Sequence, residues 1–400
     1  MKITQVDTVQ LAAYPNITWV QIHTDSGLVG LGETFRGAQA VQAQIHELTA
    51  PYLLGKDALA IEAHHHHLLH GYIGFASSGV ETRAASAVDI ALWDLLGQAT
   101  DQPLYQLLGG AVRDRVPVYN TCAGYTYNSA TQRRVVTDGG AELPPEGPYE
   151  DQEAFVKRPA QLAESLLSEG YKAMKIWPFD PFAAASRGQS ISAKDLDTAL
   201  KPFREIRRAV GEEMDIMVEF HSMWNLPMAV RIAQALEEFK PYWAEDPIQM
   251  TNLDTIAEYR SRVRIPVCAS ETLATRQPFL HLLTRNAVDY VMLDLSWVGG
   301  ITEAKKIAAI AQAFHKPVAP HDCTGPVVLA ASLHMAMSTP NVVLQEVVRA
   351  YLSGWYRDLV TQLPTVRDGF ATVPAGAGLG MALSPALLKR SDVTVRTSRR

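Results

Sequence analysis

The sequence has few cysteines and no long apolar run. Its three cysteines, Cys122, Cys268 and Cys323, are far apart and odd in number, so they do not suggest a disulfide framework and they favour a reducing compartment. No uninterrupted apolar stretch is long enough to span a membrane, and the first ten residues lack the apolar core of a signal peptide. We therefore expect a cytoplasmic protein with no membrane partner.

Positive charge is not in excess either. The 36 Lys and Arg residues are outnumbered by 42 Asp and Glu residues, and the net charge of −6 argues against a nucleic-acid partner. An anionic small molecule is not excluded, because a bound divalent cation can invert the local field. The 400 residues are enough for a barrel of about 250 residues and a smaller second domain. Closed homo-oligomers are the default for such proteins, so we expect one here.

The first part of the chain changes from strand-like to helical patterns. Alternating apolar residues predict strands over 3–11, 19–23 and 28–33, and apolar residues at spacings of three and four predict helices over about 39–109. Strands followed by helices favour an α+β arrangement. We predict an α+β capping domain over residues 1–112.

Beyond Gly110 the sequence alternates between short apolar strands and amphipathic helices, which is typical of parallel βα units. Eight candidate strands are present, the number that closes a β/α barrel, and active sites of such barrels lie at the C-terminal strand ends. We predict an α/β fold with a TIM-type (β/α)8 barrel over 113–362, and a tail, 363–400, that returns to complete the cap. The candidate strands are Val116–Cys122, Ala173–Trp177, Asp215–Phe220, Tyr242–Asp246, Val267–Glu271, Tyr290–Asp294, Pro317–Pro320 and Val342–Val347.

Residues 123–150 are rich in Gly, Pro, Thr and Asn and predict a long loop after the first barrel strand. A loop of this length inside a compact domain is more often functional or disordered than incidental. A lid or a subunit contact is the corresponding hypothesis.

Three glutamates end three successive candidate strands. Glu219, Glu245 and Glu271 are each 26 residues from the next, which is about one βα repeat and would place the carboxylates side by side at one barrel mouth. Any one of them alone could be a surface residue. Three glutamates at the same spacing indicate a cluster of hard oxygen ligands, which suits Mg²⁺.

Two histidines and two further carboxylates share the same rim. His221 lies two residues after Glu219 and would point to the same side of an extended segment. His321 ends the seventh strand beside Asp294 at the end of the sixth, and a carboxylate next to an imidazole makes a credible general base. Glu346 ends the eighth strand. Most lone histidines are structural, but strand ends beside a metal cluster favour a catalytic role for these two.

Several motifs together carry a family resemblance over nearly the whole chain. They are the Trp93-Asp94 helix, the three glutamate strands, the Asp294/His321 pair, Gly299-Gly-Ile-Thr302 and Leu344-Gln-Glu346. With this set the chain resembles the mandelate racemase subgroup of the enolase superfamily. Within it, the chain is similar to acid-sugar dehydratases of the D-galactonate and D-mannonate dehydratase type. The resemblance implies a modified β/α barrel whose cap is built from both chain ends.

The resemblance also implies a mechanism. The three glutamates would bind Mg²⁺, which holds the substrate carboxylate and stabilises the enediolate formed when the α-proton leaves, as is general for this superfamily. His321 would be the base, oriented by Asp294, and His221 the acid that protonates the departing β-hydroxyl. Lys175 and Glu346 would contact the substrate carboxylate. The implied reaction converts an aldonate-type sugar acid into a 2-keto-3-deoxy acid.

The chain departs from the family pattern at two positions. The racemases carry a Lys-x-Lys pair on the second strand, whereas this strand reads Lys175-Ile-Trp177, and an indole cannot return a proton. Racemisation by a Lys/His pair is therefore disfavoured, while dehydration stays intact. The first metal ligand is usually Asp but is Glu219 here, which affects the fine geometry and not the ligand set.

Weaker signals surround this core. We include Trp177 and Arg276 as substrate-binding candidates, although an exposed loop arginine is the simpler interpretation of Arg276. Trp224 and Trp297 follow active strands and would either line the site or pack under loops. The run His64–His67 would suit a transition metal at helical spacing, but we interpret it as a polar helix surface.

Two other functions compete with the dehydratase hypothesis. An epimerase, racemase or cycloisomerase would use the same proton abstraction without losing water, and the position of His221 relative to the substrate β-hydroxyl discriminates between them. A non-catalytic binding or regulatory barrel is the third, because fold alone does not fix function. Such a barrel would be expected to lack a ligand or the His/Asp pair, and neither is missing here.

Overall fold

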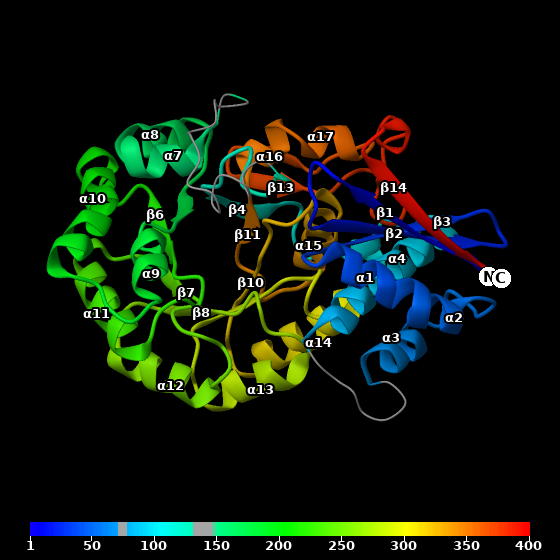
Figure 1. Ribbon diagram of the computed structural model, residues 1–400, viewed down its shortest axis with the longest axis horizontal. Coiled ribbons are helices and arrows are strands. Elements are labelled where there is room, and N and C mark those ends of the chain that lie inside the picture. Colours follow the sequence, from blue (N-terminus) through cyan, green and yellow to red (C-terminus); the bar gives the residue numbers. More distant parts are fainter. Residues whose placement is uncertain (71–77, 131–146, 148) are drawn as a thin grey trace.

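An antiparallel sheet forms the base of the cap. The computed structural model describes residues 1–70, 78–130, 147 and 149–400 (Figure 1). The cap sheet has the order β14-β1-β2-β3, so its edge strand comes from the other end of the chain. The strands are β1 (Ile3–Leu11), β2 (Ile17–Thr24), β3 (Val29–Phe35) and β14 (Val393–Arg399).

Helices pack on one face of this sheet. The longest, α4, lies along β3 at very short range, since a Cβ on Gly32 would fall 1.8 Å from the Ala87 carbonyl oxygen and one on Gly30 2.2 Å from that of Ala91. Glycine is therefore required at both positions for the backbones to approach. The cap elements are α1 (Ala38–Gln44), η1 (Ile45–Thr49), α2 (Ala50–Leu53), α3 (Ile61–His70), α4 (Val80–Thr100) and α5 (Leu104–Leu107).

Eight parallel strands form the barrel, and each falls within a predicted strand. Hydrogen-bonded pairs run from β4 to β10 in chain order, and β11 pairs with β4. A bridge between Val318 and Val342 brings the segment before β11 next to β10. The predicted modified β/α barrel with an α+β cap is thus the observed architecture. The strands are β4 (Val116–Thr121), β5 (Ala173–Ile176), β6 (Asp215–Glu219), β7 (Trp243–Glu245), β8 (Val267–Ala269), β9 (Tyr290–Leu293), β10 (Val318–Pro320) and β11 (Gln345–Val347).

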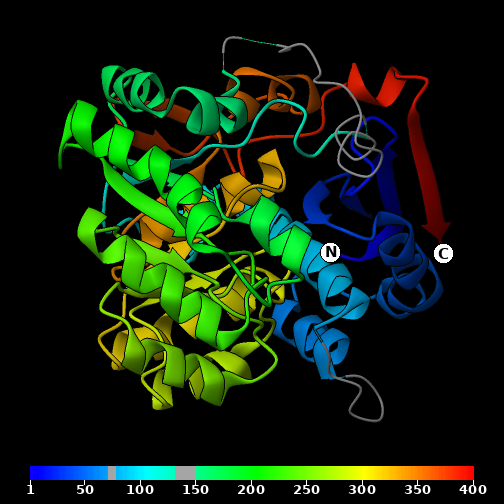
Figure 2. The same ribbon diagram turned by 60° about the vertical axis from the view of Figure 1, so that its left-hand side comes forward.

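Helices surround the barrel, as Figures 1 and 2 show. Inside, inward-facing side chains such as Tyr119, Met217 and Trp243 fill the interior as a separate apolar cluster, so the barrel is a packed core and not a pore. No described helix combines the length and the apolar character needed to cross a membrane. The described helices after β4 are α7 (Asp151–Lys157), α8 (Pro159–Ser168), α9 (Asp180–Ser186), α10 (Ala193–Val210), α11 (Leu226–Leu236), α12 (Leu253–Arg262), α13 (Arg276–Thr284), α14 (Gly300–Ala313), α15 (Pro326–Ser338), α16 (Arg349–Ser353) and α17 (Tyr356–Leu359).

Buried polar contacts hold the cap on the barrel. The Glu33 carboxylate accepts hydrogen bonds from the Val328 backbone N–H at 2.9 Å, in the first turn of α15, and from Trp19 Nε1 at 2.6 Å. Burial raises the pKa of Glu33 to about 8. Thr34 Oγ1 donates to the Ser296 carbonyl at 2.8 Å, just after β9. The end of β3 is therefore fixed against the catalytic end of the barrel.

The tail after the barrel serves both parts of the fold. Its hairpin, β12 (Thr365–Arg367) and β13 (Phe370–Thr372), pairs with barrel strand β4 and not with the cap. Further on, Leu379 N donates to Asp94 in α4, and β14 pairs with β1. The tail thus contacts the segment around α5 of the cap from Gly378 onward. The domain boundaries at 112 and 363 stay predictions, and residues 131–146 and 148 of the predicted loop lie outside the described residues.

Candidate active site

The three glutamates meet at the C-terminal ends of their strands. Glu219 and Glu245 are direct neighbours in the β6–β7 register, and Glu271 lies two residues beyond β8. One carboxylate oxygen of each lies within 4.8 Å of those of the other two. Glu219 and Glu245 are buried, and Glu271 is half-buried at the wall of a pocket. The 26-residue spacing therefore places them together, as expected.

Lys175 on β5 supplies a positive charge to this cluster. Its Nζ lies 2.5 Å from Glu245 Oε1, 2.9 Å from Glu346 Oε1 and 3.5 Å from Glu219 Oε2. Burial lowers the pKa of Lys175, but these carboxylates outweigh burial and raise it well above its ordinary value. A charged lysine thus faces more acidic groups than it can neutralise.

The donor set suits a hard divalent cation. Burial, followed by the neighbouring Glu219 carboxylate, raises the pKa of Glu245 well above its ordinary value. Crowded buried carboxylates of this kind are stabilised when a cation is shared between them. All the available ligand atoms are carboxylate oxygens, which Mg²⁺ prefers to nitrogen or sulfur. The residues present therefore fit Mg²⁺.

His321 is held by Asp294 in one orientation. His321 Nδ1 lies 2.6 Å from Asp294 Oδ2, while Asp294 Oδ1 accepts from the backbone N–H and the hydroxyl of Ser296 at 2.6 and 2.5 Å. The Trp297 ring stacks on the imidazole with centroids 5.5 Å apart. These contacts leave Nε2 directed to the pocket, where Glu271 Oε2 lies 3.0 Å away. Burial lowers the pKa of His321, but Glu271 and Glu346 raise it well above normal.

His221 has a carboxylate partner of its own. Its Nδ1 lies 2.7 Å from Asp180 Oδ2, and its backbone, at φ +50°, is in the left-handed region. Glu219 Oε1 accepts a hydrogen bond from the His221 backbone N–H at 2.6 Å, so the turn that carries this imidazole is tied to one of the three clustered glutamates. Burial lowers the pKa of His221, but Glu219 and Asp180 raise it to about 9.

Asp180 is a site residue that the sequence analysis missed. It is the first residue of α9 and follows β5 in the loop Trp177-Pro-Phe-Asp180. The sequence could have indicated Asp180, because it is an acidic residue in a short βα loop at the C-terminal end of the barrel strands, where functional residues are common. Two carboxylate–imidazole pairs, from different strands, therefore serve one site.

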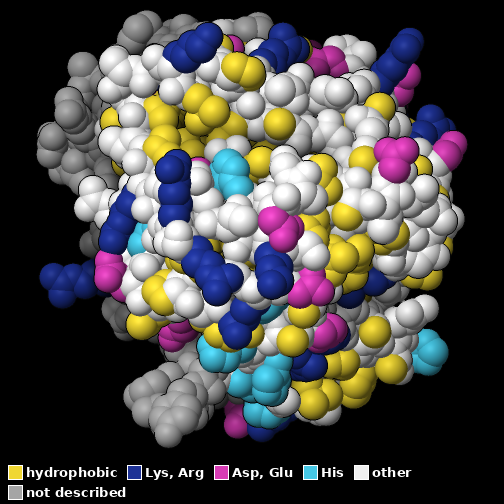
Figure 3. Space-filling view, turned by 90° about the vertical axis from the view of Figure 1, so that its right-hand side faces the viewer, with side chains coloured by type: hydrophobic (Ala, Val, Ile, Leu, Met, Phe, Trp, Pro, Cys, Tyr) yellow, Lys and Arg dark blue, Asp and Glu magenta, His cyan; other side chains and the backbone are white. Residues whose placement is uncertain are grey.

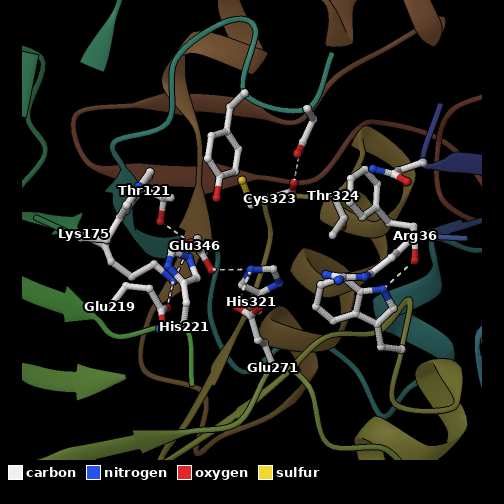
Figure 4. A pocket seen from close by; sticks show the side chains of 16 residues that line it. Arg36, Thr121, Lys175, Glu219, His221, Glu271, His321, Cys323, Thr324 and Glu346 are labelled. Carbon is white, nitrogen blue, oxygen red and sulfur yellow. Dashed lines mark hydrogen bonds and ion pairs between the residues drawn. The ribbon is translucent and has the colours of Figure 1, made fainter. Parts of the chain in front are cut away.

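The pocket between these groups has a volume of about 290 Å³. Figure 4 shows His221, Glu219 and Lys175 on one side of it, His321 and Glu271 at the centre and Arg36 on the opposite side. The cap contributes Asn16, Phe35 and Arg36, and the segment after β4 contributes Tyr127 and Asn128. Of the predicted site residues, Trp177 and Glu346 also line the pocket, as does Trp297. Asn16 lies in the predicted cap loop after Leu11.

Three other candidates lie elsewhere. Arg276 does not line the pocket, because its Nε and Nη2 donate to Glu303 at 2.8 and 2.7 Å. Trp224 lines a separate surface depression beside α11. His64 and His65 are buried, with His65 facing Glu303, so the predicted polar surface holds for His66 and His67 only. Figure 3 views the molecule from the right-hand side of Figure 1 and shows exposed histidines gathered in the lower part of that face.

Sequence comparison connects this geometry to a family. A family model described as "Enolase C-terminal domain-like" matches residues 158–387. The chain belongs to the enolase superfamily. Its first part also matches the mandelate racemase / muconate lactonizing enzyme N-terminal domain over residues 3–109. Members of the enolase superfamily bind Mg²⁺ in general, in agreement with the donor set described above.

Several relatives extend the enolase-superfamily match to the whole chain. A D-gluconate dehydratase from Thermoproteus tenax is 32% identical over 374 residues, covering 93% of this chain and 69% of the relative. A D-galactonate dehydratase from Xanthomonas oryzae pv. oryzae (strain PXO99A) is 31% identical over 401 residues, covering 98% and 94%. A solved structure, an enolase of the mandelate racemase subgroup from Agrobacterium tumefaciens, is 49% identical, has a TM-score of 0.88 and covers 100% of this chain and 99% of its own.

Proposed function

We propose that the protein is a Mg²⁺-dependent dehydratase of sugar acids of the aldonate type. The observation that carries the proposal is the pair of carboxylate–imidazole dyads, His321–Asp294 and His221–Asp180, beside three clustered glutamates. Proton abstraction next to a carboxylate needs a base, and expulsion of a hydroxyl group needs an acid. The relatives named D-gluconate and D-galactonate dehydratase support the same reaction.

Glu219, Glu245 and Glu271 would hold the metal ion, which when bound supplies electrostatic stabilisation to charge developing on the substrate carboxylate. Lys175 and Glu346 line the same wall, and Lys175 would bind that carboxylate through its ammonium group. The carboxylate end of the substrate is therefore expected on the side of β5 and β6.

The chain's own residues account for the proton movements. His321 Nε2 takes the α-proton, while Asp294 holds Nδ1 protonated and keeps the imidazole in place. His221 then donates its proton to the β-hydroxyl, which leaves as water. The resulting enol tautomerises to a 2-keto-3-deoxy acid. Trp177 packs edge-on near His221, with ring centroids 5.8 Å apart, and places an apolar side chain without a titratable group beside the acid.

The decisive experiment is a screen of aldonic and aldaric acids with Mg²⁺ in D₂O, followed by NMR. We expect a 2-keto acid and loss of the α-proton signal. Deuterium at the α-carbon without keto acid would instead indicate an epimerase or cycloisomerase. Two variants separate the steps: His321→Asn should abolish both exchange and turnover, whereas His221→Asn should retain exchange and lose elimination. Normal exchange in His321→Asn would contradict the assignment of the base.

The cytoplasmic location and the homo-oligomeric state stay predictions. A small sugar acid as the partner follows from the proposed reaction and from the size of the pocket, whose volume of about 290 Å³ suits a compact polar ligand.

A further inference from the structure

Arg36 is a pocket residue that the proposed reaction does not use. It follows β3 and reaches the site from the cap, where it lines the pocket next to Asn16. Its backbone is left-handed, with φ +78°, and its N–H donates to the Asn16 carbonyl at 2.7 Å. Non-glycine residues in this conformation are uncommon and cluster at ligand sites, where the surrounding structure holds them in place.

The backbone of this turn is fixed relative to the catalytic base. The preceding residue, Phe35, accepts a hydrogen bond on its carbonyl from Trp297 Nε1 at 2.8 Å. The same Trp297 ring stacks on His321. One short chain of contacts therefore runs from the base to the residue before Arg36. A guanidinium carried by this turn can contact one particular end of a bound substrate.

Among the residues that the structure describes, the Arg36 guanidinium has no hydrogen-bond or ion-pair partner. Figure 4 draws no hydrogen bond or ion pair from the Arg36 side chain to the other residues that line the pocket. A second arginine, Arg83, lies close by: burial lowers its pKa, and the Arg36 charge lowers it further. The cap side of the pocket thus carries Arg36 and Arg83, with Glu81 beside Arg83, whereas the opposite wall holds the clustered glutamates and Lys175.

We propose that Arg36 binds a second anionic group at the far end of the substrate, so that the enzyme prefers a sugar diacid to the monoacid of the same configuration. This rests on the proposed function, because it assumes that the reacting carboxylate lies at the metal side, and it changes the preferred substrate from an aldonate to the corresponding diacid. A guanidinium presents planar, paired donors that match the two oxygens of a carboxylate, whereas a terminal hydroxyl offers one oxygen and no counter-charge. Arg36 is exposed in the free protein, but a substrate that fills the pocket would cover its guanidinium, so the pair would be screened less than an ion pair on an open surface.

The test uses a hexaric acid and the hexonic acid of the same configuration at C2–C5, which differ only in having a carboxylate or a hydroxymethyl group at C6. Wild-type kcat/KM should favour the diacid by about tenfold or more, the range of a charge-assisted hydrogen bond. Arg36→Gln should lower kcat/KM for the diacid by about 10- to 100-fold and leave the monoacid within about threefold. Arg83→Gln is the matched control, because it removes an equal charge near the turn without touching the pocket lining, and it should retain the preference.

Equilibrium binding of the same two acids to the His321→Asn variant, with and without Arg36→Gln, tests the proposal independently of turnover. A wild-type enzyme that prefers the monoacid, or a diacid preference unchanged by Arg36→Gln in both assays, would overturn the role of Arg36. If no acid is turned over or exchanged but the diacid still binds through Arg36, the dehydratase function fails and the anion site stands.

Discussion

Replacing Asp294 with Asn tests the orientation of the catalytic base at almost constant shape. The aspartate accepts two hydrogen bonds from Ser296 on Oδ1 and contacts His321 Nδ1 with Oδ2. The backbone N–H of Ser296 can only donate, so an asparagine must keep its oxygen on that side. Its amide NH₂ then faces His321, which must accept on Nδ1 and carry its proton on Nε2.

This change of tautomer removes the base without removing the side chain. A neutral His321 protonated on Nε2 has no lone pair directed to the pocket, and the imidazolium formed during the reaction also loses its counter-charge. The same substitution in a Ser-His-Asp protease lowers kcat by about 10⁴. We therefore expect a loss of about 10³ to 10⁴, equivalent to about 4 to 5.5 kcal/mol at 1.36 kcal/mol per decade.

The assay is kcat together with α-proton exchange in D₂O, with thermal unfolding as a control for folding. Asp294→Asn should lose turnover and exchange by the same factor and unfold near the wild-type temperature. Ser296→Ala is the matched control, because the backbone N–H remains and the aspartate stays oriented, so activity should fall by about tenfold or less. Exchange within a factor of ten of wild type in Asp294→Asn would refute the tautomer argument.

Three further predictions concern the metal site, the acid and the core. Glu245→Gln should remain folded but lose the rise in Tm caused by Mg²⁺ and about 10³ in kcat, and an unchanged response to Mg²⁺ and chelator would remove Glu245 as a ligand. Asp180→Asn should lower turnover by about 10-fold and Asp180→Ala by about 100-fold with α-proton exchange intact, whereas equal loss of exchange would mean that Asp180 does not act through His221. Burial lowers the pKa of His334 to about 4 in the folded protein, whereas the ordinary value is 6.5. The unfolded chain therefore binds a proton at this histidine before the folded protein does. The free energy of unfolding should be unaffected by this group above pH 6.5 and should fall by about 3 kcal/mol as the pH drops to 4. Urea unfolding of His334→Gln should show a correspondingly smaller change between pH 7 and 4, and an identical change would contradict this origin.

The barrel was predictable because its pattern is periodic. Each strand is a short apolar run, the glutamates recur at one βα interval, and parallel strands align their ends without further information. For the same reason His321 and Asp294 could be placed together from adjacent strand ends. The spacing of residues in the sequence was therefore enough to predict the site residues at the ends of the strands.

The site residues on loops were harder to predict, because the spacing of residues in the sequence does not show which way a loop side chain points. Arg276 was a substrate-binding candidate, with an exposed loop arginine as the simpler interpretation, but its guanidinium donates to the buried Glu303 of α14 and does not line the pocket. Asp180 was missed because its partner, His221, lies 41 residues away in the turn after the next strand. The role of Arg36 depends on a cap turn placed by contacts with Trp297, which no local pattern records.

Because β14 pairs with β1, the cap sheet can be completed only after the barrel strands have been synthesised. Seven residue pairs, from Gln5 with Arg399 to Leu11 with Val393, join the two ends of the described chain. On the ribosome, β1 is made first and its outer edge then has no partner until residues 393–399 emerge, after every barrel strand. An open edge of this kind can pair with other chains. A nascent chain would therefore carry all its catalytic side chains before the cap sheet is complete, with the outer edge of β1 open in the interval.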